Sequence, residues 1–237
     1  MTAIQDNLET VNRKIKESAE KSGRKASGIK LVAVSKRFPA EAVQEAIKAG
    51  HFIFGENYLQ EAAQKFGTPP DPLARLHFIG HLQSNKAKTA AAISHTIETV
   101  DSLKLAAALN KHLLGMGKLL DILIQVNIGA DPDKSGVMPE ETEDLLLNIR
   151  RQNLSCLRVC GLMTMPPRTA EPEAARPHFR NLANLAGELA ARELFADNQK
   201  VELSMGMSGD YHVAIEEGAT IVRVGTAIFG QRPVLIT

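Results

Sequence analysis

The sequence has 237 residues, a length at which single α/β barrels are common. Its 28 basic and 27 acidic side chains give a formal charge of +1, which offers no general attraction to nucleic acid or to an anionic membrane surface. No apolar run is long enough to span a bilayer, and the charged N-terminal stretch does not resemble a signal peptide.

The two cysteines, Cys156 and Cys160, lie in a segment that reads as a strand. Four residues apart along a strand, their sulfur atoms are too distant for a disulfide without a sharp bend. No further Cys or His follows at the spacing of a metal site. We therefore expect two reduced thiols of the core type and a cytoplasmic protein.

Short β-type runs alternate with longer helical stretches along the whole chain. A charged helix over residues 2–22 comes first. The predicted strands then cover residues 30–35, 52–54, 76–79, 95–98, 121–127, 157–161, 201–204 and 220–224. The predicted helices between them cover residues 40–49, 57–66, 83–92, 101–113, 139–150, 172–195 and 209–217.

Strict alternation of strand and helix favours parallel strands joined by crossover helices. Eight such strands fit a closed (β/α)8 barrel of the TIM type, whereas six or seven would fit an open doubly wound sheet. No segment reads as a linker between two domains. The sequence thus predicts an α/β protein, a single barrel domain over residues 1–237 with an extra N-terminal helix.

Lys36 ends the first apolar run, directly after Val34 and Ser35. A lysine amine in apolar surroundings loses its proton more easily, and the neutral amine is a nucleophile that forms Schiff bases with carbonyl compounds. A solvated loop lysine is the alternative for any single residue of this kind. In a barrel the position matters, because the chemistry lies at the carboxyl ends of the strands.

The loops after the seventh and eighth strands are rich in small residues. They run from Ser204 to Gly209 and from Gly225 to Gly230. In many barrels these two loops bind a phosphate group, since backbone N–H groups can approach the anion closely. Each loop alone could be an ordinary tight turn, but both occur where the barrel places a phosphate site.

Arg223 lies within the apolar eighth strand, where a charge is costly unless it is paired or hydrogen-bonded. It either forms a salt bridge to a nearby carboxylate such as Glu202 or donates to a ligand in the barrel mouth. In a closed barrel the first and eighth strands are neighbours, so Lys36, Arg223 and the phosphate loops would lie together. These groups suit an aldehyde that carries a phosphate.

Other strand ends carry polar side chains. Asn57 and Asn127 read as ligand-orienting or loop-fixing residues. His81 could act as a general acid or base, although a lone histidine more often bonds to backbone or water. Residues 131–136 resemble half of a calcium loop but lack its ligand spacing and its closing Glu, so a turn is predicted there.

Six motifs spread between residues 31 and 230 together resemble the pyridoxal phosphate homeostasis protein family. They are Val34–Lys36, Phe54–Tyr58, His77–Lys86, Gly161–Met165, Leu203–Ser208 and Val222–Gly230. The resemblance implies a barrel like the N-terminal domain of alanine racemase, with pyridoxal 5′-phosphate (PLP) bound to Lys36 as an aldimine.

The resemblance also implies the other cofactor-binding residues. Ser204, Gly225 and Thr226 match the phosphate cup, Arg223 matches the arginine that faces the pyridine nitrogen, and the pocket includes Asn57 and Met163. The chain departs from the family pattern at residues 209–212, where Gly-Asp-Tyr-His follows Ser208.

The implied function is to hold PLP for intracellular homeostasis or for delivery to apo PLP enzymes. An arginine at the pyridine nitrogen disfavours ring protonation and makes the ring a poorer electron sink. The first alternative is a PLP-dependent racemase or lyase. Alanine racemases use a tyrosine from a separate C-terminal domain, which we do not expect in a chain that ends at Thr237, and neither Tyr58 nor Tyr211 has a sequence reason to face Lys36.

The second alternative is a Schiff-base aldolase acting on a phosphorylated sugar. Its lysine more often ends the sixth strand, where this chain has Cys160 and Gly161. We therefore expect a non-catalytic PLP-binding protein, and a monomer because the dimer-forming domain of the racemases is not expected.

Overall fold

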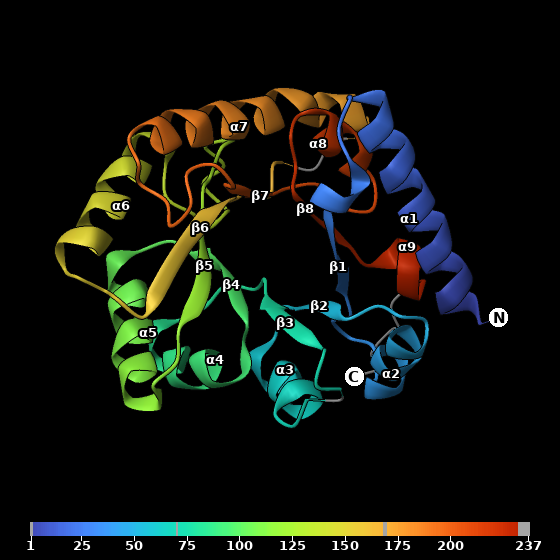
Figure 1. Ribbon diagram of the computed structural model, residues 1–237, viewed down its shortest axis with the longest axis horizontal. Helices are drawn as coiled ribbons and strands as arrows, with labels where there is room; N and C mark the ends of the chain where they lie inside the picture. Colours follow the sequence, from blue (N-terminus) through green and yellow to red (C-terminus); the bar gives the residue numbers. More distant parts are fainter. Residues whose placement is uncertain (1, 70, 168–169, 232–237) are drawn as a thin grey trace.

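The computed structural model describes residues 2–69, 71–167 and 170–231. Eight parallel strands close into a barrel in the order β1 to β8, and the helices surround it (Figure 1). The predicted TIM-type barrel is confirmed, and the open doubly wound sheet is ruled out by the pairing of β1 with β8.

The strands are β1 (Lys30–Val34), β2 (Ile53–Glu56), β3 (Arg75–Phe78), β4 (Thr96–Val100), β5 (Leu120–Gln125), β6 (Leu157–Met163), β7 (Glu202–Ser204) and β8 (Ile221–Val224). The helices are α1 (Ala3–Lys21), α2 (Ala40–Lys48), α3 (Leu59–Phe66), α4 (Ala87–Ile93), α5 (Leu103–Met116), α6 (Thr142–Arg151), α7 (Arg176–Ala191), α8 (Tyr211–Glu216) and α9 (Thr226–Phe229). All eight predicted strands are found, each end within two residues of its prediction.

The helix predictions differ from the structure in three ways. Short 3-10 turns precede α4, α6 and α7 where one continuous helix was predicted. The predicted helix 172–195 ends at Ala191, and Glu193 beyond it has a positive φ of 57°, which stops helical hydrogen bonding. The one-turn helix α9 was not predicted, because four residues carry no readable helical period.

The extra N-terminal helix α1 covers the outside of the barrel near the β8–β1 junction (Figure 1). Leu8, Val11 and Ile15 recur at helical spacing and are buried. The helix packs against α8, α9 and α2, and the Asn7 amide donates a hydrogen bond of 2.8 Å to the carbonyl of Ile228. It therefore braces the segment that follows β8.

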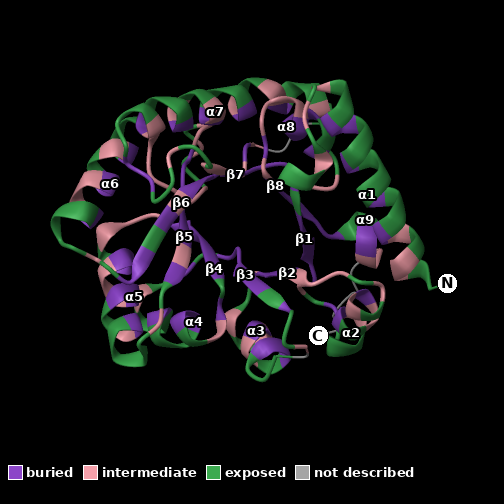
Figure 2. Cartoon of the chain, in the orientation of Figure 1, coloured by how far each residue is buried: buried purple, intermediate pink, exposed green. Residues whose placement is uncertain are grey.

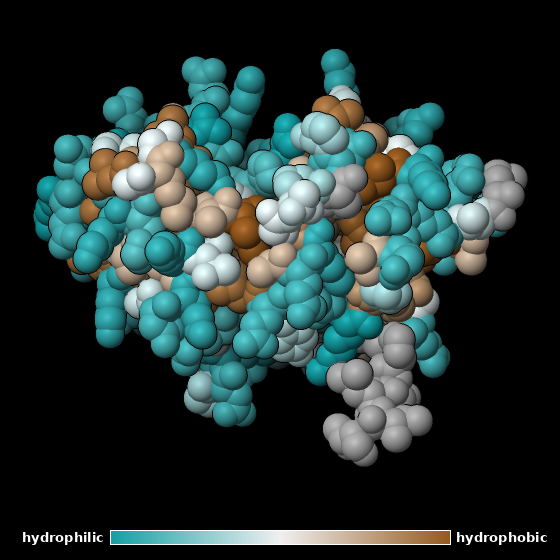
Figure 3. All heavy atoms as spheres, turned by 90° about the horizontal axis from the view of Figure 1, so that it is seen from below, coloured by the Kyte–Doolittle hydropathy of each residue, from teal (hydrophilic) through white to brown (hydrophobic). Residues whose placement is uncertain are grey.

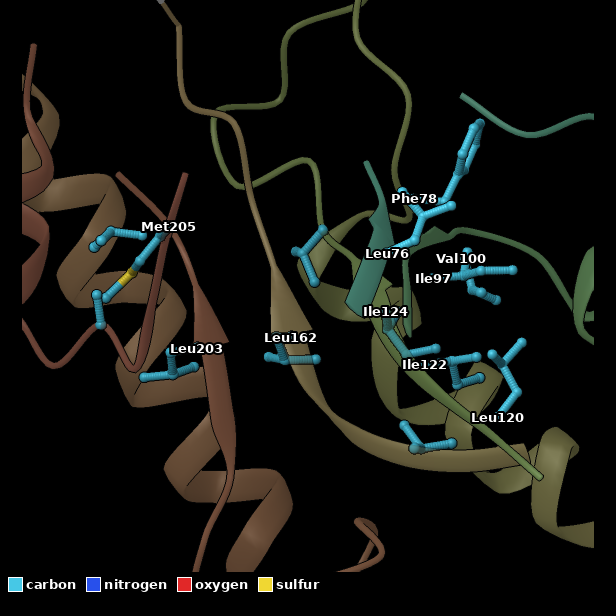
Figure 4. Close-up of a cluster of buried hydrophobic side chains, with 14 of the residues drawn as sticks. Leu76, Phe78, Ile97, Val100, Leu120, Ile122, Ile124, Leu162, Leu203 and Met205 are labelled. Carbon is cyan, nitrogen blue, oxygen red and sulfur yellow. The ribbon is translucent and has the colours of Figure 1, made fainter. Parts of the chain in front are cut away.

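Buried side chains form two layers, one on each side of the barrel wall. The larger layer lies between strands and helices, with Leu76, Ile97, Ile124 and Leu162 among its members (Figure 4). The smaller one is built from Val32, Leu123, Met163 and Ile221. Colouring by burial shows strands that are mostly buried, with exposed positions in β3 and β6, and helices that are partly exposed (Figure 2).

The face drawn in Figure 3 is mainly hydrophilic, with hydrophobic patches between the hydrophilic side chains. Within residues 2–69, 71–167 and 170–231, no helix combines the length and apolar character needed to cross a bilayer.

Candidate functional site

A pocket of about 380 Å³ opens at the carboxyl ends of the strands, a size within the usual range of ligand pockets. We call it the mouth pocket. Its lining comes from the segments that end β1, β2, β7 and β8, with one residue each after β3 and β6. The lining residues are Val34, Lys36, Asn57, Ile79, Met165, Met207, Ser208, Gly209, Arg223, Gly225 and Thr226.

Lys36 stands in the turn after β1, between two residues that are fixed by hydrogen bonds. The Ser35 hydroxyl donates to Glu56 Oε1 at 2.7 Å, and the Ser35 carbonyl accepts from Lys65 Nζ at 2.7 Å. On the other side, the Arg37 backbone N–H donates to a carboxylate oxygen of Glu61 at 2.5 Å. The backbone that carries Lys36 is therefore held from β2 and α3.

The ionic cluster behind Lys36 is buried. Lys65 Nζ lies 2.8 Å from Glu56 Oε1 and 2.7 Å from Glu61 Oε1, and the Lys65 side chain is only 6% exposed. Burial raises the pKa of the Glu56 carboxyl, and this shift is opposed by Lys65 and Ser35. The second oxygen of Glu56 has no hydrogen-bond partner within the described residues.

The loop after β7 places Ser208 against the loop after β8. The Gly225 N–H donates to the Ser208 hydroxyl at 3.2 Å, and the Met207 N–H donates to Asp210 Oδ1 at 2.6 Å. Gly206 has a φ of +90°, and a Cβ there would lie 2.6 Å from the Cβ of Ala214. Only glycine suits this turn.

Arg223 is buried and lies at the inner end of the mouth pocket. Its guanidinium donates to the Ser204 hydroxyl at 2.5 Å and to the Thr164 carbonyl at 2.7 Å, and lies 3.9 Å from Glu98 Oε2. The carboxylate partner is therefore Glu98. The alternative Glu202 instead pairs with Lys30 at the other end of the barrel.

The mouth pocket brings together five of the seven predicted binding residues: Lys36, Asn57, Arg223, Gly225 and Thr226. Met163 and Ser204 are fully buried inside the barrel and do not line it. The Ser204 hydroxyl is hydrogen-bonded to both Arg223 and Glu98. It accepts from Arg223 and donates to Glu98 at 2.5 Å.

The predicted binding residues did not include Met165, Met207, Ser208 and Gly209, which also line the pocket, although the last three lie in the predicted phosphate loop Ser204–Gly209. The sequence held a signal that favoured Ser208 over Ser204. Ser204 lies within the predicted seventh strand, whereas Ser208 follows the end of that strand, where ligands bind in barrels.

The other polar candidates lie outside the mouth pocket. The Asn127 side chain donates to the Asp131 carbonyl and accepts from its N–H, so it fixes the 131–136 turn. His81 Nδ1 lies 3.3 Å from the Ser135 hydroxyl. Tyr58 accepts from Arg37 and is 47% exposed, whereas Tyr211 is buried beside Gly206.

Two comparisons settle the family. The model of the alanine racemase N-terminal domain family matches residues 2–233. The pyridoxal phosphate homeostasis protein of Vibrio alginolyticus is 42% identical over 236 residues, which cover 98% of this chain and 99% of that protein. The chain belongs to the pyridoxal phosphate homeostasis protein family.

Solved structures agree with this family. PipY of Synechococcus elongatus, solved with PLP bound, superposes with a TM-score of 0.82 at 33% identity, covering 96% of this chain and all of that one. Alanine racemase of Clostridium difficile, in complex with cycloserine, gives a TM-score of 0.72 at 17% identity over 97% of this chain and 61% of the racemase. The racemase likeness concerns the barrel fold.

The donor set of the mouth pocket fits the cofactor of this family. PLP carries an aldehyde, a pyridine nitrogen and a phosphate dianion. The pocket offers the amine of Lys36, the guanidinium of Arg223 and, on the adjoining loops, the hydroxyls of Ser208 and Thr226. Each group of the cofactor thus has a partner of suitable chemistry.

Proposed function

We propose that this protein binds pyridoxal 5′-phosphate in the mouth pocket, with the Lys36 amine holding the aldehyde as an aldimine. In this proposal Ser208, Gly225 and Thr226 bind the phosphate, and Arg223 faces the pyridine nitrogen. Asn57 lines the pocket beside the pyridine ring. Ser204, which is hydrogen-bonded to Arg223, and Met163 support the site from the barrel interior. Family membership and the composition of the pocket support this arrangement.

We further propose that the protein stores or delivers PLP inside the cell and is not an enzyme. One observation carries this part of the proposal. Among the described residues that line the mouth pocket, the only ionisable side chains are Lys36 and Arg223. Racemisation requires a second acid or base opposite the lysine, and an arginine stays protonated at neutral pH, so it cannot act as the base.

When bound, PLP supplies a reactive aldehyde to the Lys36 amine. The hydrogen bonds on both sides of Lys36 hold the backbone from which its amine extends. The unpaired thiols of Cys156 and Cys160 suit a reducing cytoplasm, and we propose a cytoplasmic monomer that meets apo PLP enzymes there.

Borohydride reduction followed by peptide mapping tests the binding mode. The wild type loaded with PLP should carry the label on Lys36, and Lys36→Ala should lose both the label and the visible absorption. Lys86→Ala, which changes an exposed lysine outside the mouth pocket, is the matched control and should keep both. A label on another lysine would overturn the assignment of Lys36.

Incubation with single amino acids tests the carrier role. The PLP-loaded protein should leave the enantiomers of each amino acid unchanged, and it should restore activity to an apo PLP enzyme in a coupled assay. Racemisation or lyase turnover at about 1 s⁻¹ or faster would defeat the carrier proposal in favour of an enzyme.

A further inference from the structure

A row of hydrogen-bonded polar side chains crosses the barrel interior behind Arg223. His77 on β3 lies with Nδ1 2.6 Å from Glu98 Oε1 on β4. The Ser204 hydroxyl on β7 donates to the other oxygen of Glu98 at 2.5 Å and accepts from Arg223 at 2.5 Å. We call His77, Glu98, Ser204 and Arg223 the interior row.

The row contains a fully buried anion and a nearly fully buried cation. The Glu98 side chain is 0% exposed and that of Arg223 is 2% exposed. Burial opposes ionisation of Glu98, but His77, Arg223 and Ser204 outweigh it and lower the pKa of this carboxyl. Glu98 is therefore a carboxylate, and Arg223 is a guanidinium whose positive charge it compensates.

The two ends of the interior row reach different cavities. Arg223 lines the mouth pocket, whereas His77 lines a cavity at the amino-terminal ends of the strands. That lower cavity also contains Lys30, Arg75 and Lys118. Of the interior row, only Arg223 contributes to the lining of the mouth pocket, so Glu98 can affect a ligand there only through space or through Arg223.

We propose that Glu98, held by His77, is a positioning residue that fixes the Arg223 guanidinium and cancels most of its charge toward the mouth pocket. The consequence concerns the orientation in which a phosphate-bearing ligand binds. An uncompensated guanidinium would attract a phosphate group, whereas a compensated one leaves the phosphate to the loops of Ser208 and Thr226. This use of the row rests on the proposed binding of PLP.

Inorganic phosphate, titrated into the cofactor-free protein by calorimetry, tests the charge effect without PLP. Glu98→Gln keeps the shape of the side chain and removes its charge, so phosphate should bind about fivefold more tightly. Glu98→Asp should return the affinity toward that of the wild type. Thr142→Val removes a different, part-buried hydrogen bond, from Thr142 to the Met138 carbonyl, and should leave phosphate affinity unchanged. Equal affinity in Glu98→Gln and wild type would overturn the proposal.

The position of the guanidinium is tested by NMR of the same cofactor-free proteins. In the wild type the Arg223 side-chain N–H signals should be resolved and slow to exchange with water. They should be lost in Glu98→Gln and in Ser204→Ala, and kept in Thr142→Val. If Glu98→Gln does not fold, Ser204→Ala and His77→Gln provide the comparison. Slow exchange that persists in all of these variants would overturn the positioning role.

The absorption spectrum of the PLP-loaded protein completes the test. Glu98→Gln should shift the visible maximum, whereas Thr142→Val should not, and an unshifted maximum in Glu98→Gln counts against the proposal. Failure of the proposed function is seen separately: a wild type that takes up no PLP would contradict cofactor binding, while the phosphate and NMR results would still decide the role of Glu98.

Discussion

The ammonium group of Lys65 lies 2.7 Å from the carbonyl oxygen of Ser35, the residue that precedes Lys36. A buried lysine thus holds the backbone of the pocket lysine, and the same ammonium group pairs with Glu56 and Glu61. The two lysines have different environments: one is enclosed in an ionic cluster, and the other lines the mouth pocket.

Replacing Lys65 by Met should destabilise the protein by about 3 kcal/mol, because it leaves the buried carboxylate of Glu56 without its cation. Chemical denaturation in urea measures the loss. The double variant Lys65→Met/Glu56→Gln should recover at least about 1 kcal/mol of it, since no unpaired charge then remains.

The exposed pair of Arg13 and Glu17 provides the control for this experiment, since both side chains are more than half exposed. Arg13→Met should cost no more than about 0.5 kcal/mol. A loss as small as this in Lys65→Met would show that the buried cluster does not stabilise the segment of Lys36.

Stability should decline as the pH falls from about 6.5 to about 4, in part because of His95. Partial burial, followed by the charges of Arg75 and Lys118, lowers the pKa of His95 to about 4. The unfolded chain, with an ordinary histidine pKa of about 6.5, then binds this proton more tightly than the folded protein. The contribution of His95 is complete above that range and is lost as the pH falls through it.

The variant His95→Asn isolates this contribution from the other ionisable groups. His95 Nδ1 accepts a hydrogen bond from the Leu76 N–H at 3.1 Å, and an Asn side chain keeps an acceptor near that place. The urea midpoints of wild type and variant should differ less at pH 7.5 than at pH 4.5. On going to pH 4.5, the stability of the wild type should fall more than that of the variant. A difference independent of pH would contradict the assignment.

The barrel was predictable from the sequence because each strand is a short apolar run followed by a longer helical stretch. Even β4, with polar residues such as Thr96 and Glu98, was found because the alternation requires a strand there. The helix α9 was not predicted. It has four residues, begins after Gly225 and packs against α1, and so short a segment has no hydrophobic period of its own.

Site residues were predictable from the sequence only where they directly follow the end of a strand. Lys36 and Thr226 follow strand ends, and the barrel rule places such residues at the mouth. The pairing of Glu98 with Arg223 joins residues far apart in the sequence through the barrel interior, and no local pattern indicates it. The burial of Lys65 was equally hidden, because lysines are usually exposed.

Ser208 and Ser204 should affect anion binding differently. Ser208→Ala removes a hydroxyl from the mouth pocket and should weaken binding of inorganic phosphate about tenfold, the loss expected for one hydrogen bond to a charged group. Ser204→Ala removes no lining atom, and should instead mobilise Arg223. Calorimetry on the cofactor-free variants measures both, and a weaker effect in Ser208→Ala than in Ser204→Ala would reverse the assignment of the phosphate-binding serine.

Gly206 and Gly187 should respond in opposite directions to alanine. Gly206 has a φ of +90°, and an added Cβ would meet the Cβ of Ala214 at 2.6 Å and the Cα of Tyr211 at 2.9 Å. Gly206→Ala should therefore cost more than about 1 kcal/mol and weaken phosphate binding. Gly187 is exposed within α7 and has no atom within 4 Å of an added Cβ. Gly187→Ala should therefore raise the free energy of unfolding by about 0.5–1 kcal/mol. Urea denaturation decides, and a Gly206→Ala variant as stable as the wild type would show that the loop can adopt another turn.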